Sequence, residues 1–369
     1  MANTILEIRC TGTPYEIGVT HGTSAKDRIA GSIAFYTRLF ETSCSLTWSQ
    51  VLQEAGKYLE PLESLAPRYL EEIRGIAHGS GLSFLDILAL NIRTEITFGL
   101  FSDGDDDNVP SKDSIAIADV PSDGCTSLGW VTASGTSFLA QNWDWMVEQA
   151  PNLVICHVSQ PGTDIPAFSM VTEAGIIGKI GLNAAGVGCC LNAIKCHGVN
   201  PSKLPIHFAL RKALESTSRA AAIDAIKKAG VAGSGHILIG DATGSTGLEC
   251  TSKWVKEVDM DRDNRVCHTN HLLLDKSDVH EVPWLMDSRP RLARIRELVA
   301  PLRNPSLEAL ADLFADVEGY PSSINRRQEG DSNAETLFTI VMDLTAKSAQ
   351  VTFGRPTEAR GKVVLSFWQ

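Results

Sequence analysis

The sequence lacks any apolar run that approaches the length of about 18 residues that a membrane-spanning helix requires. Hydrophobic residues make up 43% of its 369 residues and charged residues 21%, as in an ordinary soluble globular chain. Its first ten residues are too polar for the apolar part of a secretory signal, and the final SFWQ matches no peroxisomal or endoplasmic-reticulum address. We therefore expect a cytoplasmic protein that does not bind membranes.

Basic residues are in the minority. The chain has 33 Lys and Arg against 44 Asp and Glu, which gives a formal net charge of −11. Because an acidic protein repels phosphate backbones and anionic lipid headgroups, we expect neither nucleic acid nor a membrane surface as a partner. An acyl donor that carries phosphates would need a local basic patch, and the sequence does not locate one.

The nine cysteines form no recognisable disulfide framework, since their number is odd and their spacing irregular. We expect a reducing environment in which most of them serve as small core hydrophobes. Cys267, His268 and His271 lie close together in the chain, but no second ligand pair completes a zinc pattern. We therefore expect no metal and no cofactor.

The chain divides into two regions that differ in the spacing of their apolar residues. Residues 4–10 predict a strand, and residues 14–100 are mostly helical in pattern, with apolar residues spaced for one buried helix face at Ile29, Ile33, Tyr36 and Phe40. The acidic segment 102–114 predicts a linker.

Beyond the linker, short strand patterns alternate with Gly, Pro, Asn and Asp, and two helices are predicted at about 205–229 and 288–314. The predicted strands are 137–140, 153–158, 167–171, 187–191, 236–239, 337–342, 350–353 and 363–367. No repeat of about 20–50 residues is apparent, which excludes a solenoid. The pattern favours a layered α+β fold with sheet on sheet inside and helices outside.

The chemistry is expected at Asp123-Gly124-Cys125-Thr126, just after the linker region. Gly124 has no side chain, so its carbonyl is open to attack by the Cys125 thiol. The attack would shift the acyl group from nitrogen to sulfur, and water would then hydrolyse the thioester. The cut would leave Cys125 with an α-amine of ordinary pKa, about 7.7–8, which can act as the base for its own thiol. The alternative is that Cys125 is a buried structural cysteine like most others.

Two polar residues are candidates to assist Cys125. Asp144 ends Gln141-Asn142-Trp143-Asp144, and its carboxylate could orient the new ammonium group; the alternative is a turn-capping aspartate. Asn270, in the segment 266–271, could donate a hydrogen bond to a tetrahedral oxyanion, and one such donor is worth about 2.7–4 kcal/mol. The alternative for Asn270 is a turn residue between ordinary histidines.

A series of short motifs, in order over nearly the whole chain, carries a family resemblance: residues 12–18, 21–22, 71–77, 93–95, 123–126, 141–144, 172–179, 213–218, 268–271 and 354–357. With these motifs the sequence resembles the isopenicillin N acyltransferase family, the acyl-CoA:6-aminopenicillanic acid acyltransferases of penicillin-making fungi. The resemblance implies the α+β fold of N-terminal-nucleophile (Ntn) hydrolases, a four-layer αββα sandwich. It also implies self-cleavage between Gly124 and Cys125.

The same resemblance implies a small subunit, 1–124, and a large subunit, 125–369, that stay associated as one domain. It makes Cys125 the nucleophile, with Asp144 assisting and Asn270 contributing to the oxyanion site. Arg326 matches a family arginine and could bind a substrate carboxylate, although a surface salt-bridge arginine is the alternative.

Three further residues are candidates for substrate binding: Ser127, Thr251 and Ser332. Thr251 corresponds to a serine of the family, at a shifted position. Ser332 also corresponds to a family serine, but the next residue is Asn333 where the family has an arginine. These differences do not affect the nucleophile, but they leave the identity of the acceptor substrate undetermined.

The resemblance implies an acyltransferase that moves an acyl group from an acyl-CoA co-substrate, through an acyl-Cys125 thioester, to a small amine such as 6-aminopenicillanic acid. One alternative is an amidohydrolase of small N-acyl or β-alanyl amides, and a second is an uncleaved, non-catalytic binding protein. We also expect the acidic linker to cover the site before cleavage, because a lid beside the scissile bond is well placed.

Overall fold

The computed structural model describes residues 5–101 and 124–367. The acidic linker 102–114, with its predicted role as a lid, and Asp123 of the cleavage motif lie outside the described residues. Within these residues, no helix combines the length and the apolar character needed to span a membrane.

The N-terminal part of the chain is one strand followed by helices, as the sequence predicts. These elements are β1 (Leu6–Thr11), α1 (Pro14–Ser24), α2 (Lys26–Cys44), α3 (Trp48–Gly56), α4 (Leu59–Leu65), α5 (Pro67–Ser80), α6 (Phe84–Asn91) and α7 (Arg93–Gly99). Local chemistry fixes where α1 begins: the Thr13 hydroxyl caps the Glu16 N–H, the Glu16 carboxylate accepts from the Thr13 N–H, and Pro14 occupies the first turn.

The strands form two sheets. The eight-stranded sheet A has the order β1-β4-β5-β6-β7-β8-β9-β10, and the six-stranded sheet B has the order β11-β2-β3-β12-β13-β14. The strands of sheet A after β1 are β4 (Leu153–Ser159), β5 (Phe168–Glu173), β6 (Ile180–Asn183), β7 (Gly188–Ala193), β8 (Gly235–Asp241), β9 (Gly244–Cys250) and β10 (Val255–Val258). The strands of sheet B are β2 (Gly124–Val131), β3 (Ser137–Trp145), β11 (Arg265–His268), β12 (Glu335–Asp343), β13 (Ser348–Phe353) and β14 (Gly361–Ser366).

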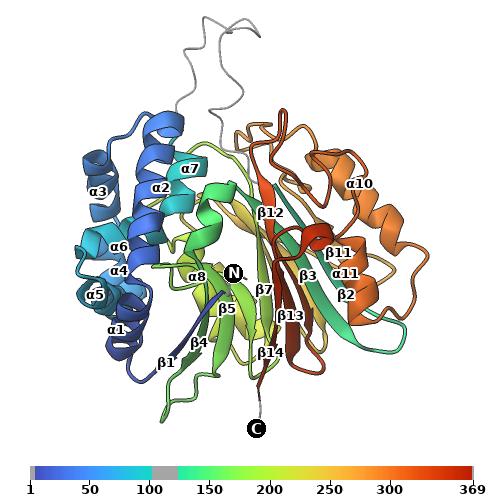
Figure 1. Cartoon of the computed structure of the whole chain (residues 1–369), viewed down its shortest axis with the longest axis horizontal. Helices are drawn as coiled ribbons and strands as arrows, with labels where there is room; N and C mark the ends of the chain where they lie inside the picture. Colours follow the sequence, from blue (N-terminus) through green and yellow to red (C-terminus); the bar gives the residue numbers. More distant parts are fainter. Residues whose placement is uncertain (1–4, 102–123, 368–369) are drawn as a thin grey trace, which may run out of the picture.

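The remaining helices complete the two outer layers. They are α8 (Ile206–Leu214), α9 (Arg219–Ala229), α10 (Ser288–Val299) and α11 (Leu307–Leu313), with short 3-10 turns η2 (Val147–Asn152) and η3 (Pro356–Glu358). Figure 1 shows α1–α8 on the sheet A side and α10 and α11 on the opposite side of the molecule. Contacts of α8 and α9 with sheet A, of α10 and α11 with sheet B, and of β2 with β7 and β9 define four layers, helix–sheet–sheet–helix. The predicted αββα sandwich is confirmed.

Each of the two long helices predicted beyond the linker is in fact a pair of shorter helices. The segment predicted at 205–229 is α8 and α9, since Ser218 caps a new helix at the Ala221 N–H. The segment predicted at 288–314 is α10 and α11, separated by a stretch that contains Pro301 and Pro305, which cannot donate the backbone hydrogen bonds of a continuous helix.

The cysteines lie where small apolar residues are expected. All nine are buried, and eight of them join the main core or a smaller apolar cluster beside it, while Cys267 packs between sheet B and the helices α10 and α11. Most of them therefore match the expectation of core hydrophobes, and Cys125 is distinguished from the others by its surroundings rather than by its burial.

Candidate active site

Three adjacent strands bring the sequence motifs together. In the β2–β3 ladder, Gly124 lies opposite Asp144 and Cys125 opposite Trp143. On its other edge β2 pairs with β11, where Ser127 lies opposite His268. Because β11 ends at His268, the chain places Asn270 beside the first residues of β2. Residues 124–126 and the motifs at 141–144 and 268–271 therefore meet at one end of sheet B.

Asn270 holds the backbone of Cys125. Its Oδ1 accepts a hydrogen bond from the Cys125 backbone N–H at 2.9 Å and another from Arg291 Nη2 at 2.9 Å. Its Nδ2 donates to the Ala193 carbonyl, at the end of β7, at 3.0 Å. With these partners the orientation of the amide is fixed, and its oxygen faces the nitrogen that cleavage would convert into an α-amine.

Asp144 and Arg326 lie on the other face of sheet B from the Cys125 side chain, because neighbouring residues of a strand alternate between faces. Thr336 Oγ1 donates to Asp144 Oδ1 at 2.7 Å, and Arg326 Nε lies 3.6 Å from Asp144 Oδ2. Arg326 also donates to Ser332 Oγ at 3.1 Å and pairs with Asp287. The predicted residues Asp144, Arg326 and Ser332 are thus neighbours around Gly124.

The absence of a side chain at Gly124 has a structural reason. A Cβ added there would lie 2.5 Å from Arg326 Nε, well inside van der Waals contact. Arg326 is only 1% exposed and is held by its partners, so it has little room to move. The peptide bond between Gly124 and Cys125 is therefore packed directly against a buried guanidinium group.

Replacing Gly124 by alanine is expected to slow the proposed cleavage about ten- to hundredfold. The displaced Arg326 would cost about 1–3 kcal/mol, and each 1.36 kcal/mol added to a barrier is about tenfold in rate. The uncleaved fraction after purification, followed by intact mass, measures the effect. Gly361→Ala is the matched control, because a Cβ there would meet open space. Equal cleavage in Gly124→Ala and wild type would contradict this packing argument.

The other two predicted substrate-binding residues have different surroundings. Ser127 lies on the same face of β2 as Cys125, and its hydroxyl donates to Asn192 Oδ1 at 2.8 Å. Thr251 hydrogen-bonds within its own turn, where its hydroxyl accepts from the backbone N–H groups of Lys253 and Trp254. The roles of both toward a substrate stay predictions.

A buried dyad supports the strand that leads to Asn270. His268 Nε2 lies 2.9 Å from Glu249 Oε1, and both side chains are fully buried. Burial alone would raise the pKa of Glu249, but hydrogen bonds from His268 and from the N–H groups of Leu273 and Leu274 outweigh it and lower this pKa. The dyad therefore ties β9 to the end of β11.

The Cys125 face of the sheet is backed by buried charges. Trp143, opposite Cys125, has the Lys179 ammonium 3.6 Å from its ring centroid. Lys179 forms an ion pair with Glu173, which also pairs with Arg93 at 2.9 Å. Although burial alone would raise the pKa of Glu173, the two cations outweigh it and hold that pKa well below its ordinary value. Glu173 is thus an ionised carboxylate between two buried cations.

Two residues that sequence reasoning missed complete the site. Arg291 Nη1 donates to the Cys125 carbonyl at 2.8 Å, and Asp287 Oδ2 accepts from Arg291 Nε at 2.6 Å. Their spacing of four residues at the beginning of a helix is typical of an intrahelical ion pair, and that was the available signal. Nothing in the spacing indicates that the pair is turned toward Cys125.

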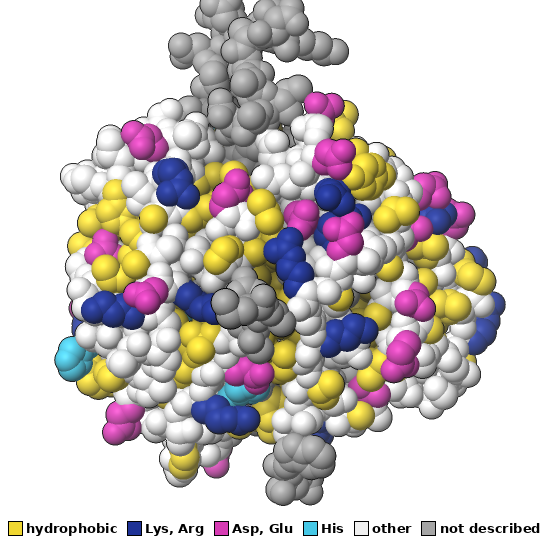
Figure 2. All heavy atoms as spheres, in the orientation of Figure 1, with side chains coloured by type: hydrophobic (Ala, Val, Ile, Leu, Met, Phe, Trp, Pro, Cys, Tyr) yellow, Lys and Arg dark blue, Asp and Glu magenta, His cyan; other side chains and the backbone are white. Residues whose placement is uncertain are grey.

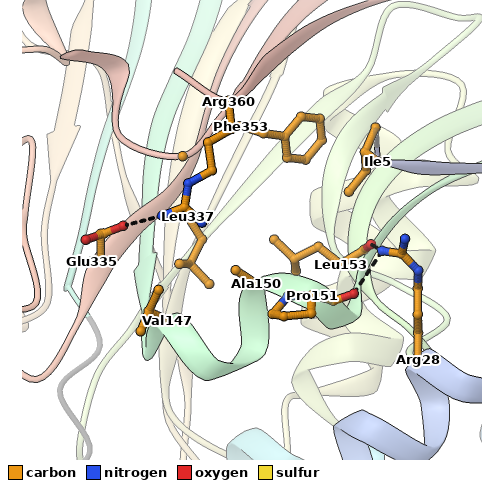
Figure 3. Close-up of a pocket in the computed structure, with 11 residues that line it drawn as sticks. Ile5, Arg28, Val147, Ala150, Pro151, Leu153, Glu335, Leu337, Phe353 and Arg360 are labelled. Carbon is orange, nitrogen blue, oxygen red and sulfur yellow. Dashed lines mark hydrogen bonds and ion pairs between the residues drawn. The ribbon is translucent and has the colours of Figure 1, made fainter. Parts of the chain in front are cut away.

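A cavity of about 300 Å³ lies at another place on the sandwich (Figure 3). Figure 3 shows Leu337, Leu153 and Phe353 around its apolar middle, with Arg360 paired to Glu335 on one side and Arg28 bonded to backbone carbonyls on the other. None of the described residues that line it is a predicted site residue.

A smaller cavity of about 120 Å³ includes Asn270 in its wall, together with Trp284, Lys276 and Arg289. It adjoins the predicted oxyanion residue, but Cys125 is not among the residues that line it. Over the face of the molecule seen in Figure 2, Lys and Arg side chains are interspersed with Asp and Glu rather than gathered in one place.

Two comparisons with known proteins match more than half of this chain. The family model of acyl-coenzyme A:6-aminopenicillanic acid acyl-transferases matches residues 130–358. The 40 kDa form of acyl-coenzyme A:6-aminopenicillanic-acid-acyltransferase from Emericella nidulans is 38% identical over 366 residues, which cover 98% of this chain and 96% of that protein.

Solved structures with some similarity are more distant in sequence. The N-acylethanolamine-hydrolyzing acid amidase orthologue of Caenorhabditis elegans is 16% identical, with a TM-score of 0.44, over 60% of this chain and 93% of that chain. A variant of conjugated bile acid hydrolase from Clostridium perfringens is 15% identical, also with a TM-score of 0.44, over 66% of this chain and 92% of that chain. On the family match and the full-length relative together, this chain belongs to the acyl-coenzyme A:6-aminopenicillanic acid acyltransferase family.

Proposed function

We propose that this chain cleaves itself between Gly124 and Cys125 and then acts as an acyltransferase through the Cys125 thiol. The observation that carries the proposal is the hydrogen bond from the Cys125 backbone nitrogen to Asn270 Oδ1 at 2.9 Å. It gives the future α-amine a fixed acceptor beside its own thiol, which is the geometry that an N-terminal nucleophile needs. Membership of the family supports the same reaction.

In the cleavage step, Cys125 Sγ attacks the carbonyl carbon of Gly124. The C–N bond breaks, a thioester forms, and the nitrogen takes up the proton that the thiol has lost and leaves as the Cys125 α-amine. Water then hydrolyses the thioester, so that Gly124 ends the small fragment with a carboxylate. Asp144 lies across the ladder from Gly124, and we assign it the role of holding the resulting ammonium group.

Each turnover then uses the thiol and the amine together. The α-amine takes the thiol proton as Sγ attacks the acyl carbon of the donor, and it returns a proton to the departing thiol of CoA. The acceptor amine attacks the acyl-Cys125 thioester, which forms the new amide and releases Sγ. Asn270 Nδ2 is the candidate donor to the oxyanion of both tetrahedral intermediates.

The contacts between the two segments support fragments that stay associated, as the prediction of one domain made from 1–124 and 125–369 requires. Strand β1 of the first segment pairs in parallel with β4 of the second over six residue pairs, from Leu6 and Val154 to Thr11 and Ser159. Helix α7 also packs against α8. Separating the segments would therefore expose a sheet edge and buried apolar surface.

Incubation with acyl-CoA thioesters of several chain lengths and 6-aminopenicillanic acid tests the transferase reaction. We expect an N-acylated product and, without the acceptor, a large fragment heavier by one acyl group on Cys125. Release of free acid at the same rate with and without acceptor would make the chain a hydrolase. Neither product nor acyl-enzyme with any donor, or with a panel of N-acyl amides, would contradict the proposal.

A further inference from the structure

The N-terminal turn of α10 contacts the site through the side chain of Arg291. Arg291 Nη1 donates to the Cys125 carbonyl at 2.8 Å and to Thr126 Oγ1 at 3.1 Å, and Arg291 Nη2 donates to Asn270 Oδ1 at 2.9 Å. One planar guanidinium group, which is only 2% exposed, thus bridges the nucleophile's own backbone and the oxyanion candidate.

We infer that Arg291 is a positioning residue for turnover by the mature Cys125 site, whereas its neighbour Arg326 serves mainly the cleavage step. This division rests on the proposed function. We base it on which side of the scissile bond each guanidinium group contacts: Arg291 contacts the C-terminal side, and Arg326 contacts Gly124 on the N-terminal side.

The Arg291 contacts all lie on the C-terminal side of the scissile bond. The Cys125 carbonyl, Thr126 and Asn270 belong to the large fragment, so these three hydrogen bonds survive the cut. A new N-terminal residue loses the restraint of the preceding chain and tends to fray. Arg291 and Asn270 hold Cys125 at its carbonyl and its nitrogen, which keeps the thiol and amine in place for each turnover.

Arg291 also acts on Asn270 electronically. A cation that donates to the amide oxygen draws electron density from the amide nitrogen and makes its N–H groups better donors. Asn270 Nδ2 is the group proposed to stabilise the oxyanion, so loss of Arg291 should lower kcat more than it raises KM.

Arg326 touches the other side of the bond. It packs on Gly124, the residue that becomes the C-terminus of the small fragment, and lies 3.6 Å from Asp144. The contact with Gly124 is made while the peptide is intact, so it bears on the position of the Gly124 carbonyl during the attack.

Asp287 joins the two arginines. Its carboxylate accepts from Arg291 Nε and Arg326 Nη2, and the two cations outweigh the effect of burial and lower its pKa. Because both guanidinium groups pair with Asp287, a substitution of either arginine is expected to slow both cleavage and turnover. The division of roles is therefore expected as a difference in how much each step is slowed.

Two lysine variants test the division, since lysine keeps the charge but cannot reproduce the planar fork. For Arg291→Lys we expect kcat per cleaved molecule, measured as CoA release from hexanoyl-CoA, to fall at least tenfold more than the cleavage rate. For Arg326→Lys we expect the cleavage rate, measured by intact mass, to fall at least tenfold more than kcat. Arg296→Lys, an exposed position on α10, is the control.

Thermal unfolding shows whether each variant folds. If a lysine variant does not, Arg291→Gln and Arg326→Gln replace the pair with the same expectation. Equal losses in both steps for both variants, the reverse pattern, or no loss would overturn the division while leaving the proposed function in place. A wild-type chain that stays uncleaved would overturn the proposed function and the division with it.

Discussion

Replacing Cys125 by alanine is expected to leave a single uncleaved chain of 39.8 kDa without acyltransferase activity. The substitution removes the sulfur that attacks Gly124 and that carries the acyl group, so both proposed steps lose their nucleophile. Intact mass and CoA release measure the two losses. Activity in both should fall to background, which is the largest effect that the account predicts.

A substitution of a second buried cysteine serves as a control that distinguishes loss of the nucleophile from loss of packing. Cys267 lies on β11, the neighbour of β2, and is 7% exposed. Cys267→Ala removes a similar volume from the apolar cluster under α10 and α11 and is expected to leave cleavage complete. If Cys125→Ala still yields two fragments, or if Cys267→Ala blocks cleavage equally, the special role of Cys125 is wrong.

Replacing Glu173 by glutamine should lower the free energy of unfolding by about 3–5 kcal/mol, the usual cost of removing one partner from a buried ion pair. Glu173 is fully buried and joins Lys179 and Arg93, both of which would lose their shared carboxylate. Urea unfolding in the uncleaved Cys125→Ala background keeps one chain and gives the midpoint and slope for each variant.

The pH dependence of the same pair of proteins gives an independent check. The folded-state pKa of Glu173 is lowered, so its contribution is present above the unfolded value of about 4.3 and is lost as the pH falls below it. The free energy of unfolding of the protein with Glu173 should therefore approach that of Glu173→Gln as the pH is lowered. Glu148→Gln, at an exposed position, is the control, and a loss for Glu173→Gln no larger than the control's would contradict this prediction.

Much of the fold could be predicted from residue pattern. The strands predicted at 153–158 and 350–353 lie within β4 and β13, because continuous apolar or alternating runs bounded by turn residues are typical of strands. The strands β2, β6, β9, β10 and β11 were missed. They are short or contain Gly or charged residues, and their formation depends on neighbours in the sheet rather than on their own propensity.

The site was predictable in part. Chemistry and family resemblance singled out Cys125, Asp144, Asn270 and Arg326, but only the strand order β11-β2-β3-β12 explains why residues so far apart in sequence meet. Strand pairing between distant segments leaves no local pattern in a single sequence.

Arg291 was missed because an arginine four residues after an aspartate in a helix is usually a solvated surface pair. Its burial and its contact with Cys125 follow from how α10 packs on β2, which is a tertiary feature.

The account depends most directly on whether the backbone breaks before Cys125 in protein that works. Intact mass and N-terminal sequencing of purified protein, shown to be active in the same preparation, measure this. We predict two associated chains, 1–124 and 125–369, with Cys125 as the first residue of the larger one. A fully active preparation in which Gly124 and Cys125 are still joined would contradict the account.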